Sequence, residues 1–122
     1  MAQDKFIGEL EQMVLLSVLQ LKAEAYGTQI RLYLADKVGR DLSIGALYTT
    51  LERLEQKGLL TARLGEATAE RGGRAKKYFA VTAEGQQALN RSKQAFDQLW
   101  QGLALKQAIH GALHQDLMEL HP

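Results

Sequence analysis

The spacing of apolar residues changes period at Gly58, and this change fixes the order of secondary structure along the chain. Before Gly58, apolar side chains recur every three or four residues, as they do in helices with a buried face. After it, Leu60, Ala62 and Leu64 alternate with polar residues, which is typical of a half-buried strand. A second alternating run covers 77–81. The sequence therefore predicts helices followed by a two-stranded hairpin.

The first predicted helix, over 9–23, is apolar on more than one side. Leu15 and Val18 extend its apolar surface beyond the face that one core needs. This helix is therefore either central in the fold or shared with a partner chain. A second helix is expected to start at Thr28, a capping residue, and to end at Val38.

The third predicted helix, from Ser43 to Gly58, has two faces of different chemistry. Its apolar residues cluster in an arc of about 80° at 100° per residue. A separate arc, centred roughly opposite, holds small, hydrogen-bonding and cationic side chains. Three helices followed by a hairpin are the order of a winged helix-turn-helix, in which the third helix enters the DNA major groove.

This arrangement predicts a DNA-binding surface. Thr49, Thr50 and Arg53 are expected to face base edges, because arginine reads guanine and threonine can contact several bases. The remaining candidates are expected to hold phosphates at the helix start, the helix margin and the hairpin. The full predicted set is Ser43, Gly45, Ala46, Tyr48, Thr49, Thr50, Arg53, Lys57, Arg71, Arg74, Lys76 and Lys77.

Positive charge gathers in the same part of the chain. The whole sequence of 122 residues has 15 Lys and Arg against 14 Asp and Glu, so its net charge of +1 says nothing about partners. Residues 40–82 carry eight basic and five acidic side chains, whereas each flanking third has a small negative excess. Clustered cations neutralise DNA phosphates. For the basic run at 71–77, a solvated hairpin tip is the alternative.

The last helical region, which starts at Thr82, carries an apolar stripe with no obvious partner in so short a chain. The stripe runs to about residue 101, then moves to another face in a segment that ends near residue 120. A second copy of the chain is the natural partner. We therefore expect a mainly α fold with a small β-hairpin, in which 1–81 form a winged helix-turn-helix DNA-binding domain and 82–122 a helical dimerisation region. The predicted interface comprises Leu15, Val18, Leu89, Phe96, Leu99, Trp100 and Leu103.

Catalysis and metal binding receive little support. The absence of cysteine excludes disulfides, zinc ribbons and thiol catalysis. The sequence also lacks a serine nucleophile elbow and a phosphate-binding loop, so neither an enzyme nor a cofactor is predicted. His110 and His114 have the spacing of two metal ligands, but a surface pair is favoured because no third ligand is suitably spaced. With no targeting or membrane-spanning segment in view, a cytoplasmic protein is expected.

Three blocks of residues resemble the PadR family of bacterial transcriptional regulators. They are Tyr26-Gly27 after an apolar helix, GALYTTLERLEQKGLL over 45–60 and ERGGRAKKYFAVTAEG over 70–85. Each block occurs at the family's order and spacing, and the resemblance covers roughly 7–100. One departure is Thr49, where family members commonly have proline.

The resemblance implies a transcriptional repressor that binds double-stranded DNA. It also implies a homodimer whose interface is formed by the first and the last helix. The short tail is similar to that of the compact members of the family, some of which bind flat aromatic molecules between their C-terminal helices. A small aromatic effector at Phe96 and Trp100 is thus one expectation, and plain packing of a dimer interface is the other.

A winged helix used only as a protein-interaction module is the alternative function. Such a module exposes large apolar anchors on its recognition surface. The third helix here presents threonine, arginine and lysine instead, which favours DNA.

Overall fold

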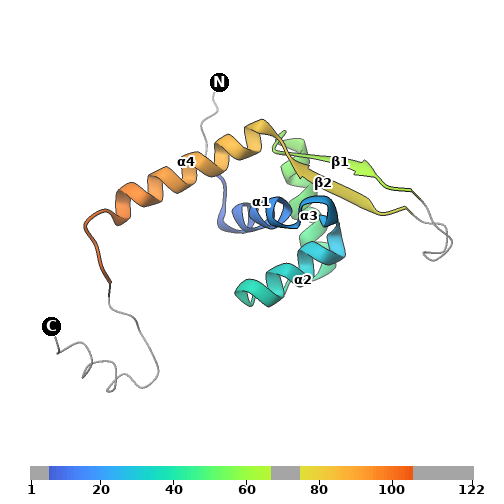
Figure 1. The fold of residues 1–122 in the computed structure, drawn as a ribbon, viewed down its shortest axis with the longest axis horizontal. Coiled ribbons are helices and arrows are strands. Elements are labelled where there is room, and N and C mark those ends of the chain that lie inside the picture. Colours follow the sequence, from blue (N-terminus) through green and yellow to red (C-terminus); the bar gives the residue numbers. More distant parts are fainter. Residues whose placement is uncertain (1–5, 67–74, 106–122) are drawn as a thin grey trace, which may run out of the picture.

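Three α-helices, a two-stranded hairpin and a long fourth helix follow one another along the chain (Figure 1). The structure, a computed structural model, describes residues 6–66 and 75–105. The order confirms the predicted winged helix-turn-helix with a small β-hairpin. The elements are α1 (Glu9–Leu21), the 3₁₀ turn η1 (Lys22–Glu24), α2 (Gly27–Val38), α3 (Ile44–Gln56), β1 (Leu60–Leu64), β2 (Lys77–Val81) and α4 (Ala83–Trp100).

Side-chain caps begin α3 and α4 at the predicted residues. The Ser43 hydroxyl accepts a hydrogen bond from the Ala46 N–H at 3.0 Å, and the Thr82 hydroxyl accepts one from the Gly85 N–H at 3.0 Å. The expected cap at Thr28 is wrong, because α2 already begins at Gly27 and its N-cap is Tyr26. The Tyr26 backbone is extended there and pairs with β2, which places the cap two residues earlier than the capping chemistry suggested.

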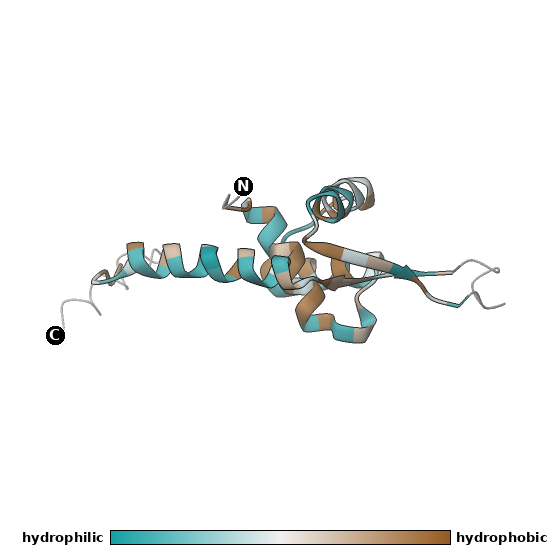
Figure 2. Ribbon diagram, turned by 90° about the horizontal axis from the view of Figure 1, so that it is seen from above, coloured by the Kyte–Doolittle hydropathy of each residue, from teal (hydrophilic) through white to brown (hydrophobic). Residues whose placement is uncertain are grey.

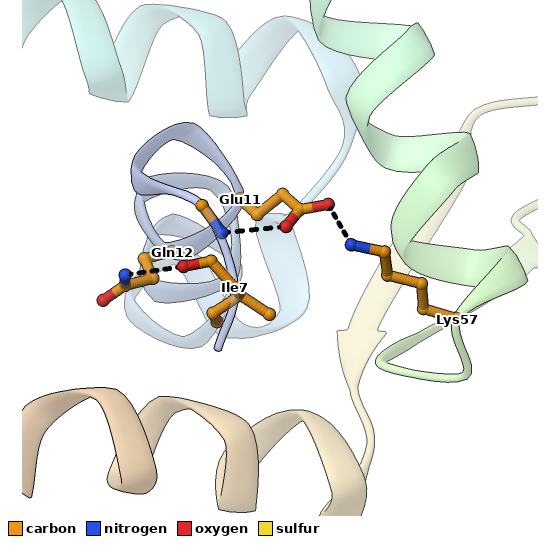
Figure 3. Close-up of polar contacts among 5 residues, drawn as sticks. Ile7, Glu11, Gln12 and Lys57 are labelled. Atoms are coloured by element: carbon orange, nitrogen blue, oxygen red, sulfur yellow. Dashed lines mark hydrogen bonds and ion pairs between the residues drawn. The ribbon is translucent and has the colours of Figure 1, made fainter. Parts of the chain in front are cut away.

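Helix α1 is the centre of the core. It packs against α2 and α3 on one side and against α4 and β2 on another. The close-up in Figure 3 shows α1 surrounded by α2, α3 and α4. Leu15 and Val18 are both buried in this single chain. Helix α1 is therefore central in the fold, and the prediction that Leu15 and Val18 contact a partner chain is wrong, because other elements of the same chain cover them. Burial of each such side chain stabilises the fold by about 1.5–3 kcal/mol.

The hairpin is anchored to the turn between α1 and α2. Strands β1 and β2 pair antiparallel, with Leu60 opposite Val81 and Leu64 opposite Lys77. The Phe79 N–H donates to the Ala25 carbonyl at 2.8 Å, and the Phe79 ring is buried in the core. The hairpin and the free end of α4 consequently lie at opposite ends of the molecule (Figures 1 and 2).

Candidate nucleic-acid interface

One side of α3 is fixed by packing and the other is open. Leu47, Leu51 and Leu54 are fully buried against the rest of the domain. The opposite side exposes Thr49 and Arg53, together with the first turn of the helix at Ser43, Gly45 and Ala46. These five residues lie where the sequence placed them. An open helix side of small, hydroxyl and guanidinium groups can fit against the edges of base pairs.

Thr50 was expected on the same open side, and this expectation is wrong. Its side chain is only 4% exposed, and its hydroxyl donates to the Ala46 carbonyl at 3.1 Å. Thr50 follows Leu47 by three residues and precedes Leu54 by four, so it lies along their side of the helix. The backbone hydrogen bond satisfies the hydroxyl and lets the residue pack like valine.

Tyr48 lies at the margin of the buried side and presses on the start of α2. A Cβ atom at Gly27 would lie 2.7 Å from the Tyr48 Cζ, so only glycine leaves room for the ring. The contact joins two of the blocks singled out in the sequence, Tyr26-Gly27 and the leucine-tyrosine pair of α3. Tyr48 is half-buried, the hydroxyl end of its ring lies against Gly27, and its expected contact with a phosphate stays a prediction.

Lys57 at the end of α3 pairs with a carboxylate that sequence reasoning missed. Its Nζ lies 2.7 Å from Glu11 Oε2, and the other Glu11 oxygen accepts the Gly8 N–H at 3.0 Å (Figure 3). Burial alone would raise the pKa of Glu11, but the hydrogen bonds from Lys57 and Gly8 outweigh it and hold that pKa below the ordinary glutamate range. A glutamate three residues into a helix signals a capping box, but not a partner 46 positions away.

The basic side chains in the described part of the hairpin differ in their partners, which are a carboxylate or an aromatic ring. Lys77 pairs with Glu55 at 3.3 Å. The Lys76 ammonium lies 3.9 Å from the centre of the Tyr26 ring, and the Arg63 guanidinium 4.8 Å from that of Tyr78. The predicted phosphate contacts Arg71 and Arg74 lie outside the described residues.

A second surface, between α1 and α4, is apolar. Phe96, Leu99 and Trp100 are exposed there, and Leu89 is half-buried. Leu103, also predicted for the interface, is exposed beyond the end of α4. Two grooves of about 520 and 580 Å³ flank the Phe96 ring, and both are lined by side chains of α1 and α4. The α1 residues that face outward here are Leu16 and Leu19, which the sequence analysis did not assign to the interface.

Within residues 6–66 and 75–105, which the structure describes, we looked for a metal site and for a membrane-spanning helix. Within them, His, Asp and Glu residues form no group of three that could hold a metal ion, and His110 and His114 lie elsewhere. Among the helices of the same ranges, none combines the length and apolarity that crossing a bilayer requires.

Comparison with known proteins places the chain in a family. Residues 15–91 match the model of the transcriptional regulator PadR-like family. No curated protein matches the chain closely enough to count as a relative.

Solved structures with the same fold carry the same description. A PadR family transcriptional regulator from Eggerthella lenta has 30% identity and a TM-score of 0.61, covering 77% of this chain and 81% of its own. A PadR family transcription regulator from Clostridium difficile has 25% identity and a TM-score of 0.60, over 75% and 91% of the two chains. A PadR-like regulator from Bacillus cereus has 26% identity and a TM-score of 0.58, over 77% and 93%. With the family match spanning more than half of its length, this winged-helix chain belongs to the PadR-like family of transcriptional regulators.

Proposed function

We propose that the protein is a homodimeric repressor that binds a pseudo-palindromic operator in double-stranded DNA. The observation that carries this proposal is the open side of α3, where Thr49 and Arg53 stand free of the packing that holds the helix. Arg53 would read a guanine through two hydrogen bonds, and Thr49 would contact a neighbouring base. At the first turn the Ala46 N–H already donates to Ser43, so the Gly45 N–H beside it would hold a phosphate.

The apolar surface between α1 and α4 supports the dimer. Phe96 and Leu99 are 56% and 71% exposed, and Leu16 lies beside them on α1. Exposed apolar patches rimmed by polar residues are typical of protein–protein interfaces. A second copy brings the same surface, so a two-fold contact covers both. Two copies of α3 would then enter successive major grooves about 34 Å apart.

Repression would follow from occupancy of the operator. A small aromatic effector is the proposed means of relief, since the grooves beside Phe96 and Trp100 are apolar and close to the dimer surface. Such a ligand would act by binding one inter-subunit geometry more tightly than the other. The proposed division of labour is DNA binding by 1–81 and dimerisation by 82–122, in a cytoplasmic protein without cofactor.

Binding to the DNA upstream of the protein's own gene tests the proposal. We expect saturable binding by a dimer that protects a palindromic site and survives competition by bulk DNA. With about eight phosphate contacts per dimer, log affinity should fall with log salt at a slope near −7. Weak binding that ignores sequence and salt would refute the operator and favour the protein-interaction module.

A matched pair of variants makes the salt experiment specific. Lys76→Gln should flatten the slope, because it removes a predicted phosphate contact at the hairpin. Lys37→Gln makes the same chemical change at the end of α2, outside the predicted surface, and should leave the slope as it is.

A further inference from the structure

We propose that Tyr26 is a positioning residue that sets the direction of the Lys76 side chain and so presents its charge to DNA phosphate. This inference rests on the proposed DNA-binding function. It concerns the point where the hairpin leaves the domain, between the N-cap of α2 and the start of β2.

Lys76 is held at both ends of the residue. Its carbonyl accepts the Gly65 N–H at 2.7 Å, which fixes the backbone at the open end of the hairpin. Its ammonium lies 3.9 Å from the centre of the Tyr26 ring. A cation over an aromatic face is stabilised by the ring quadrupole, so this side chain has a preferred direction.

Tyr26 is itself fixed by its neighbours. Its backbone forms a β-bridge with Tyr78, and the two rings meet edge to face with centres 5.4 Å apart. Gln29, one turn into α2, donates to the Tyr26 hydroxyl at 3.3 Å. The ring is therefore a rigid support, and the Lys76 chain is the flexible member of the pair.

Lys76 differs from the other lysines of the predicted surface because its partner, the Tyr26 phenol, carries no negative charge. Lys57 lies against the carboxylate of Glu11 and Lys77 against that of Glu55, so a phosphate must compete with an anion for either. A phenol orients the Lys76 ammonium without cancelling its charge. The ammonium therefore reaches a phosphate already oriented and still carrying +1.

The ionisation of Tyr26 reports on the contact without any DNA. The hydrogen bonds from Lys76 and Gln29 lower the pKa of the Tyr26 phenol. Nuclear magnetic resonance of tyrosine Cζ, assigned with a Tyr26→Phe variant, should show the pKa of Tyr26 below the ordinary tyrosine value. In Lys76→Gln the pKa of Tyr26 should rise toward the ordinary tyrosine value, because the largest cause of its lowering is removed. An unchanged Tyr26 titration would overturn the proposal.

A double-mutant cycle then tests the consequence for binding. The probe is the duplex upstream of the protein's own gene, and Lys76→Gln is measured in the wild type and in Tyr26→Leu. We expect Lys76→Gln alone to flatten the salt slope by about 0.9 per protomer and Tyr26→Leu to produce most of that change. Added to Tyr26→Leu, Lys76→Gln should then have little effect. Independent, additive effects would overturn the proposal.

Two further variants distinguish the loss of Lys76 orientation from a general disturbance of the fold. Tyr26→Phe keeps the ring and should restore most of the affinity that Tyr26→Leu loses. Tyr33→Leu is the control, because Tyr33 lies within α2, outside the predicted surface, with the Lys37 ammonium 5.9 Å from its ring centre. If the wild type binds no DNA, the proposed function fails, and the Tyr26 titration still decides whether this residue holds Lys76.

Discussion

The ion pair between Glu11 and Lys57 yields a prediction with a magnitude. Lys57→Met removes the charge and keeps most of the stem of the side chain. It leaves Glu11, whose side chain is 10% exposed, with the Gly8 N–H as its remaining hydrogen-bond donor. Loss of one partner costs about 3–5 kcal/mol in a fully buried pair and about 0–1 kcal/mol at the surface. Because Lys57 is 45% exposed, we expect an intermediate loss of about 1–2 kcal/mol.

The dependence of this loss on pH identifies its cause. The pKa of Glu11 is lowered in the folded state by Lys57 and Gly8 against the opposing effect of burial. A carboxyl with a lowered folded pKa stabilises the protein above its unfolded pKa, and that stability is lost as the pH falls through the folded pKa. The difference between wild type and Lys57→Met should therefore be full at neutral pH and should shrink in acid.

Urea unfolding followed by circular dichroism measures the loss of stability in Lys57→Met at neutral pH and in acid. Lys93→Met is the matched control, since Lys93 pairs with Asp97 at 2.8 Å but both side chains are largely exposed. It should lose no more than about 0.5 kcal/mol. Equal losses in the two variants, or a Lys57→Met loss that persists in acid, would refute the reasoning.

Four further substitutions probe the packing of the fold, the reading of DNA bases and the assembly of the dimer. Gly27→Ala should destabilise the fold by about 1–3 kcal/mol in urea unfolding, because its methyl group overlaps the Tyr48 ring. Arg53→Ala should cost about 1–3 kcal/mol of operator affinity at one base position, measured by binding to single-base variants of the site. Thr50→Val should leave that affinity unchanged, because the hydroxyl is buried and bonded within the helix; a loss comparable to that of Arg53→Ala would contradict its inward placement. Phe96→Arg should yield a monomer in sedimentation, and an unaltered dimer would exclude the α1–α4 surface as the interface.

Local signals in the sequence predicted most of the fold. The caps at Ser43 and Thr82 and the alternation on either side of the hairpin depend on neighbouring residues alone, and each lies where it was predicted. The local errors arose at the start of α2, where Thr28 was expected as the cap, and at the edge of one face of α3. Thr50 was placed outside because threonine is polar, whereas a hydroxyl bonded to its own helix can be buried.

Contacts between distant residues could not be predicted in the same way. Leu15 and Val18 were assigned to a partner interface because a helix with two apolar sides can either lie in the centre of the fold or contact a second chain. The decision depends on α4 and β2, which cover α1 within the same chain. Glu11 with Lys57 and Tyr26 with Lys76 are likewise joined by the fold alone, and periodicity carries no signal for either pair.

The division of α3 into a packed side and an open side has a consequence for how such regulators diverge. Leu47, Leu51 and Leu54 hold the helix in place, while Thr49 and Arg53 contribute little to the stability of the core. If α3 reads DNA as proposed, substitutions at these open positions change its target while the packed side keeps the helix in place. A duplicated gene could then acquire a new target site through one or two such changes, without first gaining stability to tolerate them.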